Sequence, residues 1–130
     1  MTTIVIGCGS RKASTAQLAA DLYTGTLFRL ARAAAEADGR PWMILSARHG
    51  LIAPTQILEP YNETLTSRAD VADLARLIED QADPGPVEVW AARRYIEALE
   101  MAGRTVAATP MAGLGIGQRM AWLSDHRRSQ

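Results

Sequence analysis

The segment "TIVIG", residues 3–7, is a short apolar run rich in β-branched residues, and it indicates a strand covered on both faces. Three further runs of this kind follow, at 42–46, 87–91 and, more weakly, 105–109. Apolar residues recur at helical spacing in the segments between and after them, over 26–38, 68–82, 93–102 and 115–124. This alternation predicts an α/β fold, a three-layer sandwich with a short, mainly parallel sheet of about four strands flanked by helices.

The composition limits the kinds of protein that the chain can be. Its 130 residues are 48% hydrophobic, which fits one domain over 1–130 that buries roughly two thirds of its unfolded surface. Equal numbers of basic and acidic residues, 14 each, give no general attraction to nucleic acid or membrane. The single cysteine excludes an internal disulfide, and no signal-peptide pattern or membrane-spanning apolar run is present. We expect a cytoplasmic domain without membrane association.

Cationic residues gather in the loops that follow the predicted strands. In open parallel sheets, ligands bind beyond the carboxyl ends of the strands. The loops at that edge contain "CGSRK", "SARHGL" and "AARRY", and their cations are Arg11, Lys12, Arg48, Arg93 and Arg94. We expect this edge to bind an anion, most simply a phosphate-bearing ligand. The alternative is that some arginines begin helices and face solvent, as we expect for at least one of Arg93 and Arg94.

The loop at 8–12 is predicted to hold a phosphate. Gly7 and Gly9 allow a sharp turn that leaves backbone N–H groups facing an anion, and Ser10 and Lys12 add further donors. Lys12 is the only lysine, and a compact ammonium suits such a site, although its survival by chance is an equal alternative. The spacing is neither GxxxxGK nor GxGxxG. Cys8 lacks the spacing of a cysteine phosphatase, so we favour a packed structural thiol over a nucleophile.

His49 follows the second strand beside Ser46 and Arg48, where it could donate a proton or a hydrogen bond to a ligand. A purely structural histidine is an equal alternative. One cysteine and two distant histidines supply no metal-ligand set, and no cofactor is predicted. The tail "SDHRRSQ" is expected to fray, which would leave His126 exposed.

The Pro-rich segment 51–65 is predicted to fold across the same edge as an ordered loop. It would bring Glu59, Tyr61 and Glu63 to the cations. A carboxylate there can stabilise positive charge at a sugar carbon or act as nucleophile or base, or it can merely neutralise arginines. The stretch "DLYTGTLF" at 21–28 is expected to place Tyr23 over the site and Phe28 in the core.

Several spaced motifs together resemble a family of small, uncharacterised bacterial and phage domains. They are "CGSRK", "DLYTGTLF", "W-x-ILSARHGL", "P-x-x-x-L-x-PY-x-x-TL" and the late "P-x-x-G-x-x-IG", and they span nearly the whole chain. The layout is also similar to a domain of archaeosine synthase and, more distantly, to the peroxide-stress YaaA proteins. Those resemblances imply chemistry on tRNA bases or DNA. The polar loops resemble the uracil-DNA glycosylase fold as well, but its water-activating motif and His-Pro-Ser loop are missing.

Two functions follow from these observations. The first is an enzyme, a glycosidase or base transferase, that acts at the N-glycosidic bond of a nucleotide or a nucleic-acid nucleoside, with catalytic residues His49, Glu63 and Glu59. Its ligand would be bound by Gly9, Ser10, Arg11, Lys12, Tyr23, Ser46, Arg48, Tyr61 and Arg93. The second is a non-catalytic module for a nucleotide or a nucleic-acid end, the better account if Glu59 and Glu63 both point away from Lys12 and His49. Trp90 and Trp122 would serve either a homodimer interface or the core.

Overall fold

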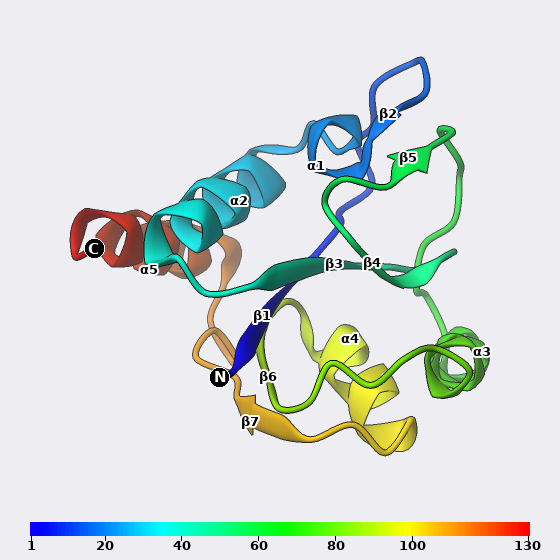
Figure 1. The fold of residues 1–130 in the computed structure, drawn as a ribbon. Coiled ribbons are helices and arrows are strands. Elements are labelled where there is room, and N and C mark those ends of the chain that lie inside the picture. The colour runs from blue at the N-terminus through cyan, green and yellow to red at the C-terminus, as the bar shows by residue number, and fades with distance from the viewer.

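The central sheet has five strands in the order β4-β3-β1-β6-β7, in a computed structural model that describes residues 1–130 (Figure 1). The strands are β1 Thr3–Gly7, β3 Trp42–Ser46, β4 Gly50–Ile52, β6 Val87–Trp90 and β7 Val106–Ala108. β1 pairs in parallel with β3 and β6, and β6 pairs in parallel with β7. β4 runs antiparallel to β3. The sheet is therefore mixed, and the prediction of a mainly parallel sheet of about four strands was wrong in this respect.

The antiparallel strand β4 forms because the chain reverses within three residues after β3. Gly50 pairs with Ser46 and has a φ of +71°, a left-handed conformation that glycine adopts readily. The side chain of Gln81 then completes the edge: its Oε1 accepts the N–H of Leu51, and its Nε2 donates to the carbonyl oxygens of His49 and Leu51. A three-residue strand inside a Pro-rich segment has too little periodicity to be identified from the sequence.

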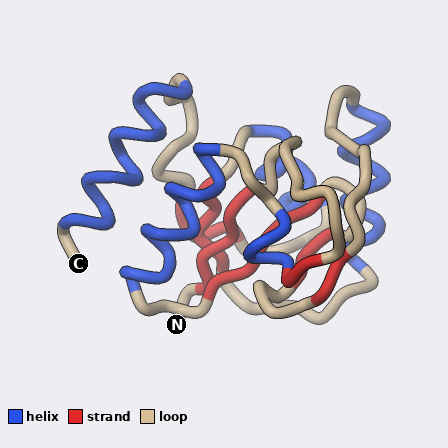
Figure 2. Tube along the Cα trace, turned by 90° about the horizontal axis from the view of Figure 1, so that it is seen from above, coloured by secondary structure: helices blue, strands red, loops and turns tan.

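Helices cover both faces of the sheet (Figures 1 and 2). On one face, α2 Thr26–Asp38 and α5 Ile116–Arg128 pack on Ile4, Ile6 and Ile44. On the other, α3 Arg68–Glu79 and α4 Arg93–Met101 pack on Val5, Leu45 and Val89. Neighbouring residues of β1 thus point into different cores, which explains why the strand is apolar throughout.

A small accessory ribbon lies beside the sheet. β2 Gln17–Leu18 pairs antiparallel with β5 Ile57–Leu58, and the short helix α1 Ala19–Leu22 follows β2. The segment 51–65 therefore contains most of β4 and all of β5, and the residues after Leu58 form no helix or strand. Phe28 is buried in the core, as predicted. No helix in the structure combines the length and the apolar character needed to cross a membrane.

The C-terminal helix is longer than the sequence indicates. α5 continues to Arg128, so the prediction of a frayed tail with an exposed His126 was wrong. His126 is half-buried, its ring stacks on Trp122 at 4.9 Å, and its Nε2 lies 2.8 Å from Oδ2 of Asp38. Trp122 in turn packs edge-on against the buried Trp90 at 5.3 Å, so both tryptophans belong to the core. These contacts hold the last turns of the helix in place.

Candidate functional site

The loops that follow β1, β3 and β6 come together at one edge of the sheet. Gly7 is paired with Leu45, and Ile6 with Trp90, so the three parallel strands end at about the same level. The backbone N–H of Cys8 donates to the carbonyl oxygen of Leu45, which joins the 8–12 loop to the end of β3. Tyr61 reaches this junction from the irregular half of 51–65, where it contacts Ser46 and Lys12. The polar loops predicted to meet therefore do so.

A pocket of about 430 Å³ opens beside the 8–12 loop. Lys12 and Arg11 supply its charge, and its full lining is Ser10, Arg11, Lys12, Ala13, Thr24, Pro60, Tyr61 and Asn62. The ammonium of Lys12 donates to the carbonyl oxygen of Ser10 at 3.1 Å and lies 4.3 Å from the centroid of the Tyr61 ring. None of the ion pairs of the protein includes Lys12 or Arg11. The pocket therefore contains two cations without an acidic partner.

Backbone pairing fixes the position of Lys12. Residues 11–13 run antiparallel to 22–24: the N–H of Thr24 donates to the carbonyl oxygen of Arg11, and the N–H of Ala13 donates to that of Leu22. Gly9, with a φ of +74°, provides the turn between β1 and this pairing. The ring of Tyr61 beneath the ammonium adds a cation–π attraction. The position of Lys12 is thus fixed by its neighbours.

A buried hydrogen-bond network holds Tyr61. The hydroxyl oxygen of Ser46 accepts the backbone N–H groups of Arg48 and His49, at 3.2 and 3.1 Å. Because both of its lone pairs are then used, its own O–H donates to the phenol oxygen of Tyr61. The phenol oxygen of Tyr61 is also 2.5 Å from that of Tyr23. One serine thereby connects the β3–β4 turn to the wall of the pocket.

The network is electrically neutral. Burial raises the pKa of Tyr61 and of Tyr23 above the usual value for a phenol, and it does the same for Tyr95. The hydroxyl of Tyr95 lies 3.6 Å from Sγ of Cys8, whose side chain is buried. Buried phenols that remain protonated supply dipoles and shape rather than charge. The positive potential of the pocket therefore comes from Lys12 and Arg11.

Tyr23 and Ser46 were predicted to bind the ligand, but neither lines the pocket. Both are buried behind Tyr61, which they support through the hydrogen bonds just described. Thr24 and Asn62 line the pocket instead. Asn62 was missed because an amide next to Tyr61 in an irregular segment has no periodic signal, although its place within the "PYNETL" motif marks it as a candidate. Gly9 is exposed and contributes the turn rather than a wall of this pocket.

His49 packs edge-on against the Tyr61 ring, with the ring centroids 5.2 Å apart. Since Lys12 lies over the same ring, the two predicted residues are neighbours, as expected. Burial and the positive charge of Arg48 both lower the pKa of His49, and Glu63 opposes them. His49 is thus a neutral imidazole at pH 7.

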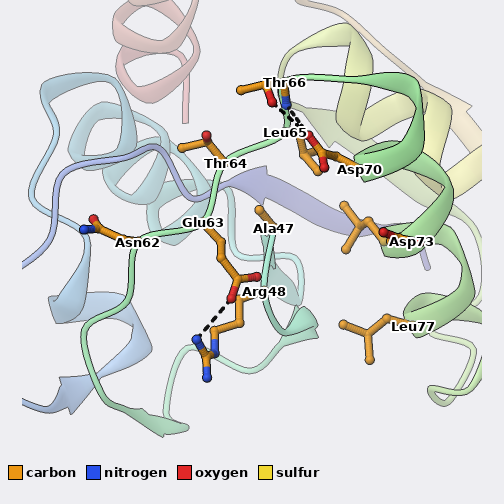
Figure 3. A pocket seen from close by; sticks show the side chains of 11 residues that line it. Ala47, Arg48, Asn62, Glu63, Thr64, Leu65, Thr66, Asp70, Asp73 and Leu77 are labelled. Carbon is orange, nitrogen blue, oxygen red and sulfur yellow. Dashed lines mark hydrogen bonds and ion pairs between the residues drawn. The ribbon is translucent and has the colours of Figure 1, made fainter.

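Glu63 lies close to this group but is engaged by an arginine. Its Oε1 accepts from Nη1 of Arg48 at 3.1 Å, and both side chains are half-exposed (Figure 3). The pair lines a neighbouring pocket of about 450 Å³, on the side of Asp70 and Asp73. Glu63 therefore borders the cationic pocket without lining it.

The remaining predicted residues lie elsewhere. Glu59 is exposed and forms no ion pair or side-chain hydrogen bond. Arg93 is 87% exposed, pairs with Glu97 and faces a pocket between α4 and β7. Arg94 donates to the carbonyl oxygen of Leu65. We expected at least one of these two arginines to begin a helix and face solvent, and Arg93 does so. No group of three or more His, Cys, Asp or Glu side chains is placed to hold a metal ion.

A comparison with protein families matches residues 3–125 to a family of unknown function, DUF6884. The chain belongs to this family. The match includes every residue of the cationic pocket and supports the expectation of an uncharacterised small domain. It shows no link to archaeosine synthase or to the YaaA proteins, and that similarity stays an expectation. A search of curated proteins finds no match.

Proposed function

We propose that this DUF6884 domain binds a phosphate-bearing ligand, a nucleotide or a nucleoside of a nucleic acid, with the phosphate in the pocket beside residues 8–12. One observation carries the proposal: Lys12 and Arg11 line a pocket of about 430 Å³ and have no acidic partner in the protein. A pocket of this size is in the range of small-molecule sites, which hold roughly 300–1,000 Å³. An anion is the partner that both cations lack.

The arrangement favours a phosphate because its donors are already ordered. The ammonium of Lys12 uses one donor on the carbonyl oxygen of Ser10, and its other donors remain available to phosphate oxygens. The hydroxyls of Ser10 and Thr24 and the amide of Asn62 provide neutral donors around it. Since Tyr61 and the 22–24 pairing already hold Lys12, little side-chain entropy is lost when a ligand binds.

Affinity measurements on a Lys12→Ala variant test this proposal. Ribose 5-phosphate and nucleoside 5′-monophosphates are titrated into the protein by isothermal titration calorimetry. A charged hydrogen bond to phosphate contributes about 1.5–3 kcal/mol, so we expect affinity to fall by roughly 10- to 150-fold. Arg29→Ala is the matched control, because Arg29 is an exposed cation of α2 that forms no ion pair. Equal affinities for the wild type and Lys12→Ala would refute the phosphate site.

Cleavage of an N-glycosidic bond is a second candidate, favoured by the position of Glu63 two residues after Tyr61 and beside Arg48 and His49. If a phosphate draws Arg48 away, the freed carboxylate can accept a proton from water as that water attacks the sugar carbon. The bond to the base then breaks, and its electron pair leaves with the base nitrogen, which takes up a proton. Arg48 would thus couple phosphate binding to the release of Glu63.

Chromatography for released base separates the two candidates. Glu63→Gln should abolish release while nucleotide affinity remains within about twofold, because Glu63 does not line the phosphate pocket. Glu59→Gln is the control, since Glu59 is an exposed carboxylate of the same segment without side-chain partners. Binding without any release would support the non-catalytic module, and equal release by wild type and Glu63→Gln would exclude Glu63 as the base.

A further inference from the structure

A second, apolar cavity of about 140 Å³ is lined in part by the same loop that lines the phosphate pocket. Gly7 and Gly9 line it, and Gly9 is followed directly by Ser10, which lines the phosphate pocket. The other walls come from α2, the end of β6, the start of α4, Met111 and Arg119 of α5, and they include the rings of Phe28, Trp90 and Tyr95. One loop thus separates an apolar, aromatic cavity from a cationic pocket.

Glycine at position 7 allows β1 to lie close to the segment that joins β6 to α4. A Cβ atom there would lie 3.1 Å from Cβ of Ala91 and 3.8 Å from Cδ2 of Tyr95, so a side chain at this position would push against the cavity wall. The ring of Tyr95 is held in addition by its hydroxyl, which contacts Sγ of Cys8. The aromatic wall is therefore fixed in position without a ligand.

Tyr61 is not free to stack on the base of a nucleotide. Lys12 lies over its ring at 4.3 Å, Arg48 lies over it at 6.0 Å, and His49 packs edge-on against it. Tyr23 is buried behind it. A ligand whose phosphate binds Lys12 must place its base against another apolar surface, and the cavity across the 7–10 turn provides one.

We propose that this cavity binds the six-membered ring of a pyrimidine base, as part of the ligand whose phosphate binds Lys12; the inference rests on the proposed function. An apolar cavity of about 150 Å³ in another protein takes up benzene, so a cavity of about 140 Å³ fits one six-membered ring, whereas a fused purine is larger. The aromatic walls supply stacking surface.

Arg119 supplies the polar contact that a base needs. It lines the cavity, and its Nε donates to the carbonyl oxygen of Leu114 at 2.9 Å, which fixes the guanidinium. Its Nη atoms form no hydrogen bond within the protein. They can donate to the C2 carbonyl oxygen that uracil, thymine and cytosine all carry. This contact recognises pyrimidines as a class.

Four probes test the proposal: ribose 5-phosphate, uridine 5′-monophosphate, adenosine 5′-monophosphate and free uracil. Stacking of one base contributes about 1–3 kcal/mol, so uridine 5′-monophosphate should bind roughly 5- to 150-fold more tightly than ribose 5-phosphate. Adenosine 5′-monophosphate should also bind more tightly than ribose 5-phosphate, but the logarithm of its gain in affinity should be less than half of that for uridine 5′-monophosphate. Free uracil at millimolar concentration should shift the NMR signals of the Phe28 ring, the single phenylalanine ring of the chain, which lines the cavity.

Filling the cavity should remove the contribution of the base alone. Ala92→Leu and, independently, Leu27→Phe place larger side chains at two of its walls. Each should reduce the affinity for uridine 5′-monophosphate to that of ribose 5-phosphate, which itself stays unchanged. Ala37→Leu, at an exposed position of α2, is the control and should change neither affinity. The Trp90 N–H signal and the unfolding temperature verify that each variant is folded.

The outcomes separate this inference from the proposal on which it rests. If Lys12→Ala weakens ribose 5-phosphate but the folded cavity variants keep the full advantage of uridine 5′-monophosphate, the pyrimidine site is refuted and the phosphate site stands. An equal gain with adenosine 5′-monophosphate also refutes it. If ribose 5-phosphate does not bind at all, the phosphate site fails, and free uracil alone decides the cavity: the absence of a shift at the Phe28 ring overturns the pyrimidine site.

Discussion

Both edges of the central sheet carry charged residues, but these residues are paired with opposite charges at one edge and lack an acidic partner at the other. At the edge where the strands begin, Arg40 donates to Asp38 at 2.7 Å and to Glu88 at 3.2 Å. Asp38 also contacts His126 at 2.8 Å, and Glu88 accepts the side-chain N–H of Trp90 at 2.7 Å. At the edge where the strands end, Lys12 and Arg11 have no carboxylate partner, although Glu63 and Glu59 lie on a nearby segment.

The difference indicates which edge stabilises the fold and which edge has cations available for the proposed ligand. Paired charges that are mostly buried join α2, β6 and α5, and removal of one partner leaves the others uncompensated. Unpaired cations at a pocket add little to stability, because nothing in the folded protein compensates their charge. The first network is therefore complete within the protein, whereas the second leaves donors without a protein partner.

The largest expected effect comes from a substitution at the edge where the strands begin and the charges are paired. Asp38→Ala leaves Arg40 and His126 without their common acceptor, and the side chain of Asp38 is only 7% exposed. We expect the free energy of unfolding to fall by about 3–5 kcal/mol, measured by urea denaturation. Asp21→Ala, which breaks the exposed pair with Arg32, should lower it by less than about 1 kcal/mol. Equal losses in the two variants would contradict the assignment of the first edge to stability.

Acidification should remove part of the same free energy. The hydrogen bonds from Arg40, and then that from His126, hold the pKa of Asp38 well below its usual range. The unfolded chain therefore binds a proton at this carboxyl at a higher pH than the folded chain does. The contribution is fully present above about pH 4 and is lost as the pH falls further. Asp38→Asn should flatten the fall in stability below pH 4.

A residual slope in the Asp38→Asn variant is expected from Asp70. Hydrogen bonds from Thr66 and Ser67 lower the pKa of Asp70 as well, so its contribution has the same sign. The matched variant Asp70→Asn removes that part and tests the separation. A wild-type slope that persists in the double variant would show that other carboxyls govern acid unfolding.

The sequence was sufficient to predict the four parallel strands and the long helices, because the strands are continuous apolar runs and the helices repeat apolar residues at helical spacing. β4, β2 and β5 were missed since they are two or three residues long. The end of α5 was also missed: its last turns are held by the contacts of His126 with Asp38 and Trp90, which both lie far away in the sequence. Local propensity does not contain such tertiary contacts.

The sequence predicted where the candidate site lies better than it predicted which residues line the pocket. The rule that ligands bind at the carboxyl ends of parallel strands brought Lys12, His49 and Tyr61 together correctly. It did not distinguish a residue that lines a pocket from one buried behind it, and Tyr23 and Ser46 are of the second kind. That distinction depends on side-chain packing, which is decided by residues from several elements at once.

Ser46→Ala tests how far the cationic pocket at the edge where the strands end depends on the buried hydrogen bonds of Ser46. The substitution leaves the N–H groups of Arg48 and His49 without an acceptor and removes the donor to Tyr61. We expect a loss of about 1–3 kcal/mol in the free energy of unfolding, together with weaker binding of ribose 5-phosphate, because Lys12 rests on Tyr61. A loss of stability with unchanged affinity would show that Tyr61 is positioned without Ser46.

The smallest expected effect compares the two histidines of the chain, one at each edge. Burial and then the charge of Arg48 lower the pKa of His49 in the free protein. A bound phosphate anion should raise that pKa, by about half a pH unit, since it favours the imidazolium across the ring of Tyr61. By linkage, affinity should rise by about threefold as the pH falls through the pKa of His49. NMR titration of the His49 imidazole with and without a dinucleotide, whose phosphodiester does not titrate in this range, measures the shift directly. His126 is paired with Asp38 at the other edge, so its chemical shifts at fixed pH should not change when the dinucleotide is added. Chemical-shift changes at His126 as large as those at His49 would mean that the anion binds without preference for the edge where the strands end.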